Sequence, residues 1–355
     1  MSENIKKLIT SFEFASIANV IFSGIFLEGQ LNELKISKNN YKIEKFNSDY
    51  QRIVNISDFK IKENDVIFSR TEDLQALFYS LKNIELKNLK LITHQSDKSV
   101  NEKIYKKKPP CISKWYSVNV DTLKDNLIPI PIGISNKHPK NLSSEDFGEI
   151  MNPREMFLKE KKDIELLYVN FQKSTNFIER SGIYKYFENF DWALVQEPNQ
   201  NKSTYLKNLK STYFTIAPFG NGFDTHRFWE ALYCGSIPVV KKQKTYKYAE
   251  NLPVLFVNNY DEITKEKLLQ KLDDVRKSNI EFNKLFFQYW KELIISEKIK
   301  INNSILVNNS NLVRKFYEFR YQTTTRLHSY KKILSYYLKK LNKLFFKSDF
   351  TVFKK

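Results

Sequence analysis

Cysteine and glycine are both scarce in this sequence, which has only two cysteines and eight glycines among its 355 residues. The cysteines, Cys111 and Cys234, lie far apart and show neither a C-x-x-C nor a Cys/His spacing. This excludes a disulfide framework and gives no sign of a zinc site. A reducing compartment such as the cytoplasm fits this cysteine usage best.

Long hydrophobic runs are also missing. The most apolar stretch near the N-terminus, residues 14–27, is interrupted by Asn19 and Ser23. It is too short to cross a bilayer, and no small-residue cleavage site follows it. We therefore expect a cytoplasmic protein.

The charge is unbalanced, because 58 lysines and arginines face 40 acids and give a net charge of +18. Such an excess favours anionic partners: nucleotide phosphates, acidic lipid surfaces or nucleic acid. An AT-rich genome also encodes proteins rich in Lys, Asn and Ile, and in that case the lysine excess has no functional cause. A nucleic-acid-binding protein should interleave arginines with aromatic residues on one face. Here lysine dominates and the charge concentrates near the C-terminus, so no nucleic-acid partner is expected.

The length predicts two domains of ordinary size, since 355 residues exceed the usual single-domain range. Residues 64–70 and 89–94 read as buried strands, and residues 71–84 between them as an amphipathic helix capped by Thr71. Strand, helix and strand at this spacing predict a parallel sheet. We assign residues 1–135 to this first, Rossmann-like domain.

A second series of strands and helices begins after a proline-rich connection between the domains, which we place at residues 136–160. From there apolar runs alternate with helical patterns, and a second doubly wound parallel sheet follows over residues 161–310. Its expected strands are 163–171, 192–196, 213–218, 237–240 and 253–258, with helices at 178–190 and 201–211 between them. Residues 263–355 read as helical and increasingly basic, and residues 311–355 form the basic C-terminal helices.

The stretch "APFGNGFDTHRFWEALYCGSIPVV" (residues 217–240) is the most distinctive in the chain, with three of the eight glycines. It predicts a strand ending at Pro218, a glycine loop, and a helix from His226 capped by Asp224 or Thr225. Gly235 is expected to end the helix in a left-handed backbone conformation, and Pro238 to lie in the next strand.

The helix in this stretch should have two different faces. At about 100° per residue, the polar side chains fall within one arc and the apolar side chains Phe228, Trp229 and Leu232 point the other way. A guanidinium beside glycine amides at a helix N-terminus suits a phosphate, and a carboxylate one turn later suits a ribose. A tight turn with a solvated polar face explains the glycines alone but not this division. The polar residues are His226, Arg227 and Glu230.

The pattern P-x-G-x-G-x-D-T-H-R-x-W-E-A-L-x-x-G-x-I-P-V-V resembles the donor-binding signature of exostosin-like glycosyltransferases and their bacterial and viral relatives, which have the two-domain GT-B fold. Weaker resemblance comes from "LLYVNFQKSTNFIER", "LITHQSD" and "WYSVNV…IPIGI". The resemblance implies two domains facing across a cleft, a nucleotide-sugar donor on the second and a glycan or lipid-linked acceptor on the first. Carried over by position, it implies a donor site of Arg180, Gly220, Asn221, Gly222, Asp224, His226, Arg227 and Glu230.

Two further expectations concern catalysis. No Asp-x-Asp pair is present, so we expect neither a metal nor any other cofactor, because cations and helix amides neutralise the leaving group in GT-B enzymes. An inverting reaction needs a base, and Asp97 and His94 lie in the loop after the strand LKLIT (89–93), where the first domain should face the cleft. Strand-end hydrogen bonding for His94 and capping for Asp97 are the alternatives. For Arg180 the alternative is an exposed helix position.

Residues 331–355 combine apolar residues on one helical face with lysines around the rest, which is typical of a helix in an anionic membrane interface. Return of the C-terminal helices to the first domain is the competing interpretation. Among other functions, a fucosyltransferase of the bacterial α-1,3 type using GDP-fucose shares the late donor motif but lacks the "GNGxDTHR" core. An inactive nucleotide-sugar binder stays open as well.

Overall fold

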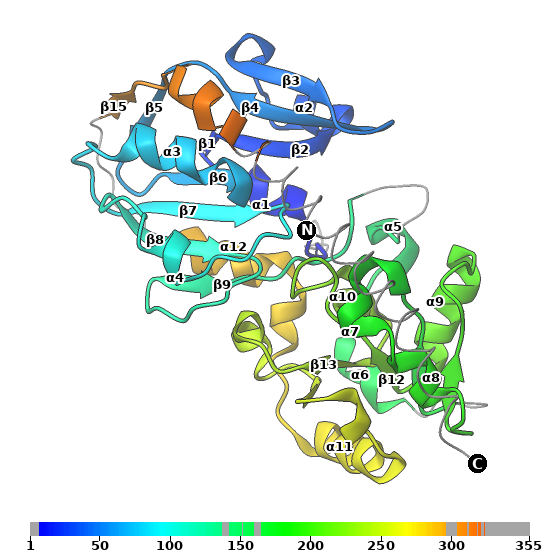
Figure 1. The fold of residues 1–355 in the computed structure, drawn as a ribbon. Helices are drawn as coiled ribbons and strands as arrows, with labels where there is room; N and C mark the ends of the chain where they lie inside the picture. Colours follow the sequence, from blue (N-terminus) through cyan, green and yellow to red (C-terminus); the bar gives the residue numbers. More distant parts are fainter. Residues whose placement is uncertain are drawn as a thin grey trace, which may run out of the picture.

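The computed structural model describes residues 7–136, 142–150, 152–159, 165–295, 304–310, 312–317, 319–320 and 323. Two α/β domains, each built on a parallel five-stranded sheet, lie beside one another (Figure 1). This confirms the predicted pair of Rossmann-like domains. The basic segment 331–355 lies outside the described residues, so the structure does not test its two interpretations.

The first domain is built on a parallel sheet whose strands follow the chain in simple order. Both strands predicted for this sheet are confirmed, and the second agrees residue for residue. They are buried on both faces, as the continuous apolar runs require. In order across the sheet, the strands are β1 (Val20–Ile21), β6 (Val66–Arg70), β7 (Leu89–His94), β8 (Ile112–Ser117) and β9 (Leu127–Pro129).

Helices cover the two faces of this sheet. Helix α3 (Leu74–Leu81) packs on one face. It ends three residues before the predicted end at 84, and a 3₁₀ turn, Thr71–Asp73, precedes it. Thr71 does not cap this helix, because its hydroxyl is buried without a hydrogen-bond partner. The remaining short helices of the first domain are α1 (Ser11–Ser16), α2 (Glu28–Glu33) and α4 (Glu102–Tyr105).

The opposite face is covered by a helix that comes from far along the chain, α12 (Phe287–Ile295). The Lys90 Nζ donates to the Ile294 carbonyl at 2.7 Å, and the Tyr116 hydroxyl donates to the Leu293 carbonyl at 3.3 Å. After it, strand β15 (Ser304–Val307) pairs antiparallel with β5 (Phe59–Lys62). The chain therefore returns to the first domain before the predicted boundary at 310, and the expectation of an all-helical segment from 263 onward is wrong at β15.

Strands β2, β3 and β4 form a small antiparallel sheet beside the parallel one. The β4 strand lies between the other two and pairs with both. Its edges are β2 (Ser23–Leu27) and β3 (Tyr41–Lys45), and β4 spans Tyr50–Asn55. This sheet sits at the top of the first domain in Figure 1.

The second domain has a strand order that reverses once. Its first strand, β10, lies between β11 and β12, so the connections leave it in opposite directions. Crevices at such switch points, outside the carboxyl ends of the strands, are where open α/β sheets bind ligands. The order is β11 (Ala193–Val195), β10 (Leu167–Val169), β12 (Phe214–Ile216), β13 (Ile237–Lys241) and β14 (Leu255–Val257).

The helices of the second domain mostly follow the predicted pattern. The predicted helix 178–190 is split in two around Ser181 and Gly182, and the predicted strand 163–171 is shorter. Gly235 adopts φ +68°, and a Cβ there would lie 2.6 Å from the Met156 carbonyl oxygen, which explains the glycine stop. The helices are α7 (Phe177–Arg180), α8 (Ile183–Phe187), α9 (Lys202–Ser211), α10 (His226–Tyr233) and α11 (Lys265–Lys277), with α5 (Ser144–Phe147) and α6 (Pro153–Leu158) in the connection.

The two domains share one buried core. It runs from the α12 side of the first sheet through α1 into the second domain. The N-terminal segment bridges both: Leu8 pairs with Phe286, and Thr10 pairs with Ile134. The Ile9 amide also donates to the Tyr233 hydroxyl at 3.2 Å. Such a boundary fixes the geometry of any cleft that the domains enclose.

Candidate functional site

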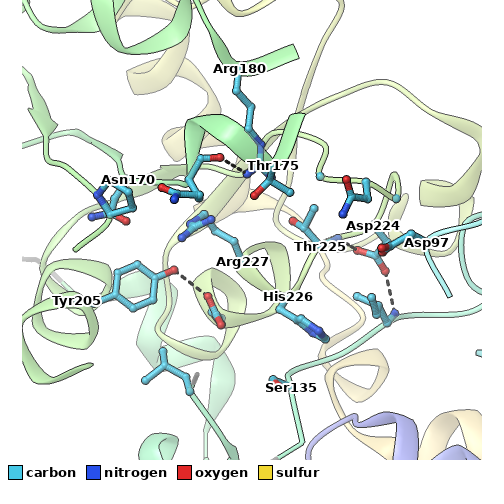
Figure 2. Close-up of a pocket in the computed structure, with 18 of the residues that line it drawn as sticks. Asp97, Ser135, Asn170, Thr175, Arg180, Tyr205, Asp224, Thr225, His226 and Arg227 are labelled. Atoms are coloured by element: carbon cyan, nitrogen blue, oxygen red, sulfur yellow. Dashed lines mark hydrogen bonds between the residues drawn. The ribbon is translucent and has the colours of Figure 1, made fainter. Parts of the chain in front are cut away.

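A cleft of about 460 Å³ opens at the switch point of the second domain. Its walls are the loops after β10 and β12, the first turn of α10 and one side of α9, with Asp97, Ile132 and Ser135 arriving from the first domain and the connection (Figure 2). All the predicted donor-site residues line it. They are Arg180, Gly220, Asn221, Gly222, Asp224, His226, Arg227 and Glu230.

The loop of residues 220–222, which we call the glycine turn, precedes α10 and is held by a side chain from the first domain. Asn119, which follows β8, accepts hydrogen bonds on its Oδ1 from the amides of Phe223 (2.8 Å) and Asp224 (2.9 Å). A Cβ on Gly222 would lie 2.6 Å from the Asn119 Nδ2. Glycine is therefore required at 222 by this close packing between the domains.

Four amides of the turn and the helix start are left without a protein acceptor. Those of Asn221, Gly222, His226 and Arg227 donate to no other residue that the structure describes. The helix α10 begins after Thr225, which makes no side-chain cap and whose hydroxyl is buried without a partner. Unpaired amides at a helix N-terminus favour an anion.

Arg227 carries the cation of this site. Its guanidinium carbon lies 5.5 Å from the centre of the Tyr205 ring, and its Nε is buried without a hydrogen-bond partner. Burial opposes the charge, but the neighbouring Tyr205 and Glu230 outweigh it and raise the pKa of Arg227. A charged group that the protein does not fully satisfy is suited to an external anion.

Glu230 lies one turn further along α10 and is 7% exposed. Its Oε2 accepts a hydrogen bond of 2.7 Å from the Tyr205 hydroxyl (Figure 2). Phe228, Trp229 and Leu232 are fully buried on the other side of the helix. The predicted division of α10 into a packed face and a polar face is therefore present.

Asp224 has a role that differs from the predicted one. Its Oδ2 accepts hydrogen bonds from the Ile132 amide (2.8 Å), the Tyr248 hydroxyl (2.8 Å) and the Trp229 indole (3.3 Å). Its Oδ1 accepts from the Thr225 amide at 2.9 Å. Burial raises the pKa of Asp224 to about 6. The carboxylate binds protein donors and ties the end of the first domain to α10.

Arg180 is also engaged by the protein itself. It is 4% exposed, which excludes the alternative of an exposed helix arginine. Its three guanidinium nitrogens donate to backbone carbonyls: Nε to Phe219 (2.8 Å), one Nη to Gln172 (2.7 Å) and the other to Pro218 (3.0 Å). Burial, together with the charge of Arg227, lowers the pKa of Arg180 to about 10. Arg180 thus joins the loops after β10 and β12 and uses three of its five N–H donors to do so, while it also lines the cleft.

His94 does not reach the cleft. It is 1% exposed, its Nδ1 accepts from the Gln95 amide (2.8 Å), and its Nε2 donates to the Pro131 carbonyl (3.1 Å). Burial lowers its pKa to about 3. Both ring nitrogens are occupied, so the ring has no lone pair for a substrate proton. The structure supports the strand-end alternative for His94 and argues against its assignment as a base.

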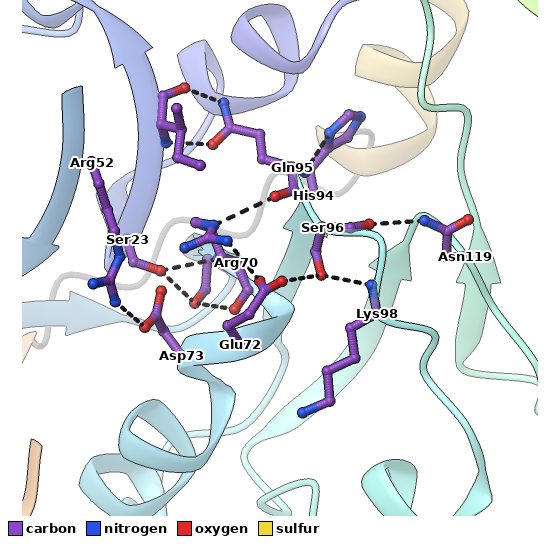
Figure 3. A network of polar contacts seen from close by, with 12 residues as sticks. Ser23, Arg52, Arg70, Glu72, Asp73, His94, Gln95, Ser96, Lys98 and Asn119 are labelled. Atoms are coloured by element: carbon purple, nitrogen blue, oxygen red, sulfur yellow. Dashed lines mark hydrogen bonds and ion pairs between the residues drawn. The ribbon is translucent and has the colours of Figure 1, made fainter. Parts of the chain in front are cut away.

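Asp97, the other predicted base, is exposed and lines the cleft. A polar network at the carboxyl edge of the first sheet holds its loop (Figure 3). Glu72 pairs with Arg70 at 3.3 Å and accepts from the Ser96 hydroxyl at 2.9 Å, and the Lys98 amide donates to that hydroxyl at 3.0 Å. This network positions Asp97 at the boundary between the domains.

Four residues of the site were not singled out from the sequence, although three of them stand in the stretches of weaker resemblance. Asn170 follows β10 directly, where the switch-point rule could have found it once the strand order was known. Thr175 lies in a 3₁₀ turn within LLYVNFQKSTNFIER, and Tyr205 lies in a polar helix with no motif. Asn119, within WYSVNV, acts through its contacts across the domain boundary, which no local pattern reveals.

Within the residues that the structure describes, no cluster of three or more His, Cys, Asp or Glu side chains could hold a metal ion. In the same part of the chain, none of the helices combines the length and the apolar character needed to span a bilayer.

The family described as RXYLT1 C-terminal domain, a glycosyltransferase-like domain, matches residues 178–334. This range contains the glycine turn, α10 and Tyr205. No curated protein matches the chain in sequence.

Solved structures with a similar arrangement are distant in sequence. An α1,3-fucosyltransferase is 10% identical, with a TM-score of 0.35, over 67% of this chain and 80% of that one. A UDP-forming α,α-trehalose-phosphate synthase from Burkholderia xenovorans is 8% identical, with a TM-score of 0.31, over 74% of each chain. AviGT4, a glycosyltransferase of avilamycin A biosynthesis, is 13% identical, with a TM-score of 0.28, over 66% of this chain and 86% of that one. The two parallel sheets themselves establish a pair of Rossmann-like domains.

Proposed function

We propose that this protein is a metal-independent glycosyltransferase, related to the exostosin-like enzymes, which moves a sugar from a nucleoside-diphosphate donor to a hydroxyl of a glycan or lipid-linked acceptor. One observation carries the proposal. At the switch point of the second sheet, unpaired amides of the glycine turn and the α10 N-terminus lie beside an arginine whose Nε has no partner. Amides and a guanidinium together suit a diphosphate, whose charge grows as the sugar leaves.

The roles of the other residues follow from this placement. Glu230, oriented by the Tyr205 hydroxyl, would accept from the ribose hydroxyls, and Asn221 would lie near the phosphates or the sugar. Asp224 and Arg180 would hold the turn and the loops in position. His226 would lie at the edge of the donor site. The first domain, which contributes Asp97, would present the acceptor.

A thermal-shift panel of nucleotide sugars and free nucleotides tests the proposal. A ligand at about 100 times its dissociation constant stabilises a protein by about 2.7 kcal/mol, which raises the melting temperature by several degrees. We expect one UDP- or GDP-linked sugar and its free diphosphate to do so, and Glu230→Ala to weaken the shift. If no nucleoside diphosphate raises the melting temperature, the whole proposal fails. If the rise requires added magnesium, only the proposed metal independence fails.

The same panel separates the competing functions. Stabilisation by GDP-fucose alone would favour the fucosyltransferase alternative. A nucleic-acid-binding protein would bind oligonucleotides with affinity that falls steeply with salt, and would ignore the nucleotide sugars.

A lipid-linked acceptor would make membrane contact useful, and we propose a cytoplasmic enzyme that is peripheral on the inner face of the membrane through residues 331–355. Liposome flotation of the full chain against a chain ending at 330 measures this. With anionic vesicles, the full chain should float and the shorter chain should stay in solution. Equal partition of the two chains would contradict the membrane contact and leave the donor assignment untouched.

A further inference from the structure

His226 is the cleft residue whose chemistry the donor site does not use. It opens α10, directly before Arg227, yet the two side chains leave the helix in different directions (Figure 2). Arg227 extends toward Tyr205, whereas the His226 ring extends toward Ser135, where the connection from the first domain enters the cleft. The ring therefore lies between the anion site and the domain that would present the acceptor.

The protonation of this ring is fixed by one hydrogen bond. The His226 Nδ1 lies 2.8 Å from the Gly133 carbonyl oxygen, which can only accept. Nδ1 must therefore carry the proton, and in the neutral ring the Nε2 keeps its lone pair. Nε2 makes no hydrogen bond with any residue in the described part of the chain. His226 thus has what His94 lacks, a ring nitrogen free to accept a proton.

The carbonyl that orients the ring is itself fixed. Gly133 adopts φ +69°, and a Cβ there would lie 2.1 Å from the Ile9 carbonyl oxygen. The next amide, that of Ile134, donates to the same Ile9 oxygen at 2.9 Å. An imidazole with one N–H held by a fixed acceptor and the other nitrogen free is the arrangement that general bases use.

From this geometry we infer that His226 is the general base of the transfer reaction and that the reaction inverts the anomeric configuration. The inference rests on the proposed function. In the step, the acceptor hydroxyl gives its proton to Nε2 while its oxygen bonds to the anomeric carbon. The bond from that carbon to the diphosphate oxygen breaks, and the nucleoside diphosphate leaves with the electron pair beside Arg227. The imidazolium then releases its proton to water.

A base on this face of the cleft requires attack from the side opposite the leaving group. In a retaining reaction without a covalent intermediate, the leaving phosphate takes the proton, and no such base is needed. The stereochemistry of the product is therefore part of the inference.

The variant His226→Asn separates catalysis from structure. The Asn Nδ2 occupies the place of the His Nδ1 and can still donate to the Gly133 carbonyl, but nothing replaces Nε2. If His226 only anchors the connection, this variant should work like the wild type. If His226 is the base, the variant should bind nucleotide normally and lose turnover by about 100-fold or more, the usual contribution of general-base catalysis.

The experiment measures release of nucleoside diphosphate from the nucleotide sugar that stabilises the wild type most, with water as acceptor, so that no acceptor need be known. We expect His226→Asn to keep the wild-type dissociation constant for the free diphosphate within about threefold and to lose at least 100-fold in release. Proton NMR of the freshly released sugar should show the inverted anomer. Wild-type release by His226→Asn, a larger loss in Asp97→Asn than in His226→Asn, or a retained anomer would each overturn the inference.

Failure of the proposed function has a different signature, namely a wild type that binds no nucleoside diphosphate. The ring itself is then still accessible through ¹⁵N NMR of the full chain labelled at histidine, with His226→Asn identifying the signal. In the neutral ring, a proton on Nδ1 and none on Nε2 are expected. A neutral ring protonated at Nε2 would overturn the base assignment without reference to any substrate.

Discussion

Replacement of Arg227 by methionine should strongly weaken nucleotide binding while leaving the empty protein folded. Charge-assisted hydrogen bonds contribute about 1.5 to 3 kcal/mol each, and a guanidinium can make two to a phosphate. We therefore expect the dissociation constant for the nucleoside diphosphate to rise by about 100-fold or more, measured by titration calorimetry. Methionine removes the guanidinium, and with it the cation–π contact with the Tyr205 ring.

Arg227 also affects the stability of the empty protein. Its Nε is buried and unpartnered, which opposes folding, whereas the neighbouring Tyr205 and Glu230 favour the charged guanidinium and raise its pKa. Methionine removes both effects and leaves the Glu230 carboxylate without this cation. The melting temperature of Arg227→Met without ligand should therefore fall, but by less than the shift that a bound diphosphate produces. A variant that is unfolded without ligand would show that Arg227 is needed for the fold of the α10 region.

Arg227→Lys is the matched control, because it keeps the charge and loses the planar fork. It should bind the diphosphate with an affinity between those of the wild type and Arg227→Met. Full affinity in Arg227→Met would place the diphosphate elsewhere and contradict the donor site proposed here.

The strands could be predicted because their signal is local. The run Leu89–His94 is buried on both faces, and polar residues lie on either side of it. The same holds for β6 and β13. Strand β15 was missed because its pattern is short and its partner, β5, lies more than 200 residues away in the sequence. The local sequence does not show which strand a distant segment of the chain will pair with.

The candidate site shows the same limit at the level of single residues. The positions around α10 were found because a glycine turn before an amphipathic helix has a local physical meaning. The roles of individual side chains depended on distant atoms: Pro131 occupies His94, whereas Gly133 leaves His226 one free nitrogen. Arg180 looked like a surface or phosphate residue until three carbonyls from two other loops surrounded it. The sequence can place a histidine or an arginine near a site. It does not show whether protein groups occupy the hydrogen-bonding atoms of that side chain or leave them for a ligand.

Replacement of Asp224 by alanine should cause the largest loss of stability of any substitution in the cleft. Four donors converge on this carboxylate, and all four would lose their acceptor inside the protein. Breaking a buried charged network by removing one partner costs about 3 to 5 kcal/mol. We expect the melting temperature to fall by about 5 °C or more, measured by differential scanning calorimetry.

Asp224→Asn gives a graded comparison. An amide oxygen at the Oδ2 position can still accept from the Ile132 amide, the Tyr248 hydroxyl and the Trp229 indole, while its NH₂ faces the Thr225 amide and loses that bond. The loss should therefore be smaller than for alanine. Asp125→Ala, at an exposed aspartate outside the cleft, should change stability by less than about 0.5 kcal/mol.

The order of these three variants tests why an acidic residue sits in the donor motif. If Asp224 bound the substrate, alanine and asparagine would both impair nucleotide binding and leave the empty protein as stable as Asp125→Ala does. If it ties Ile132, at the end of the first domain, to the start of α10, the two variants should lose stability in proportion to the hydrogen bonds removed. Binding should then weaken only as far as the glycine turn shifts. We expect the second pattern, because a carboxylate with four protein donors has no capacity left for a ligand.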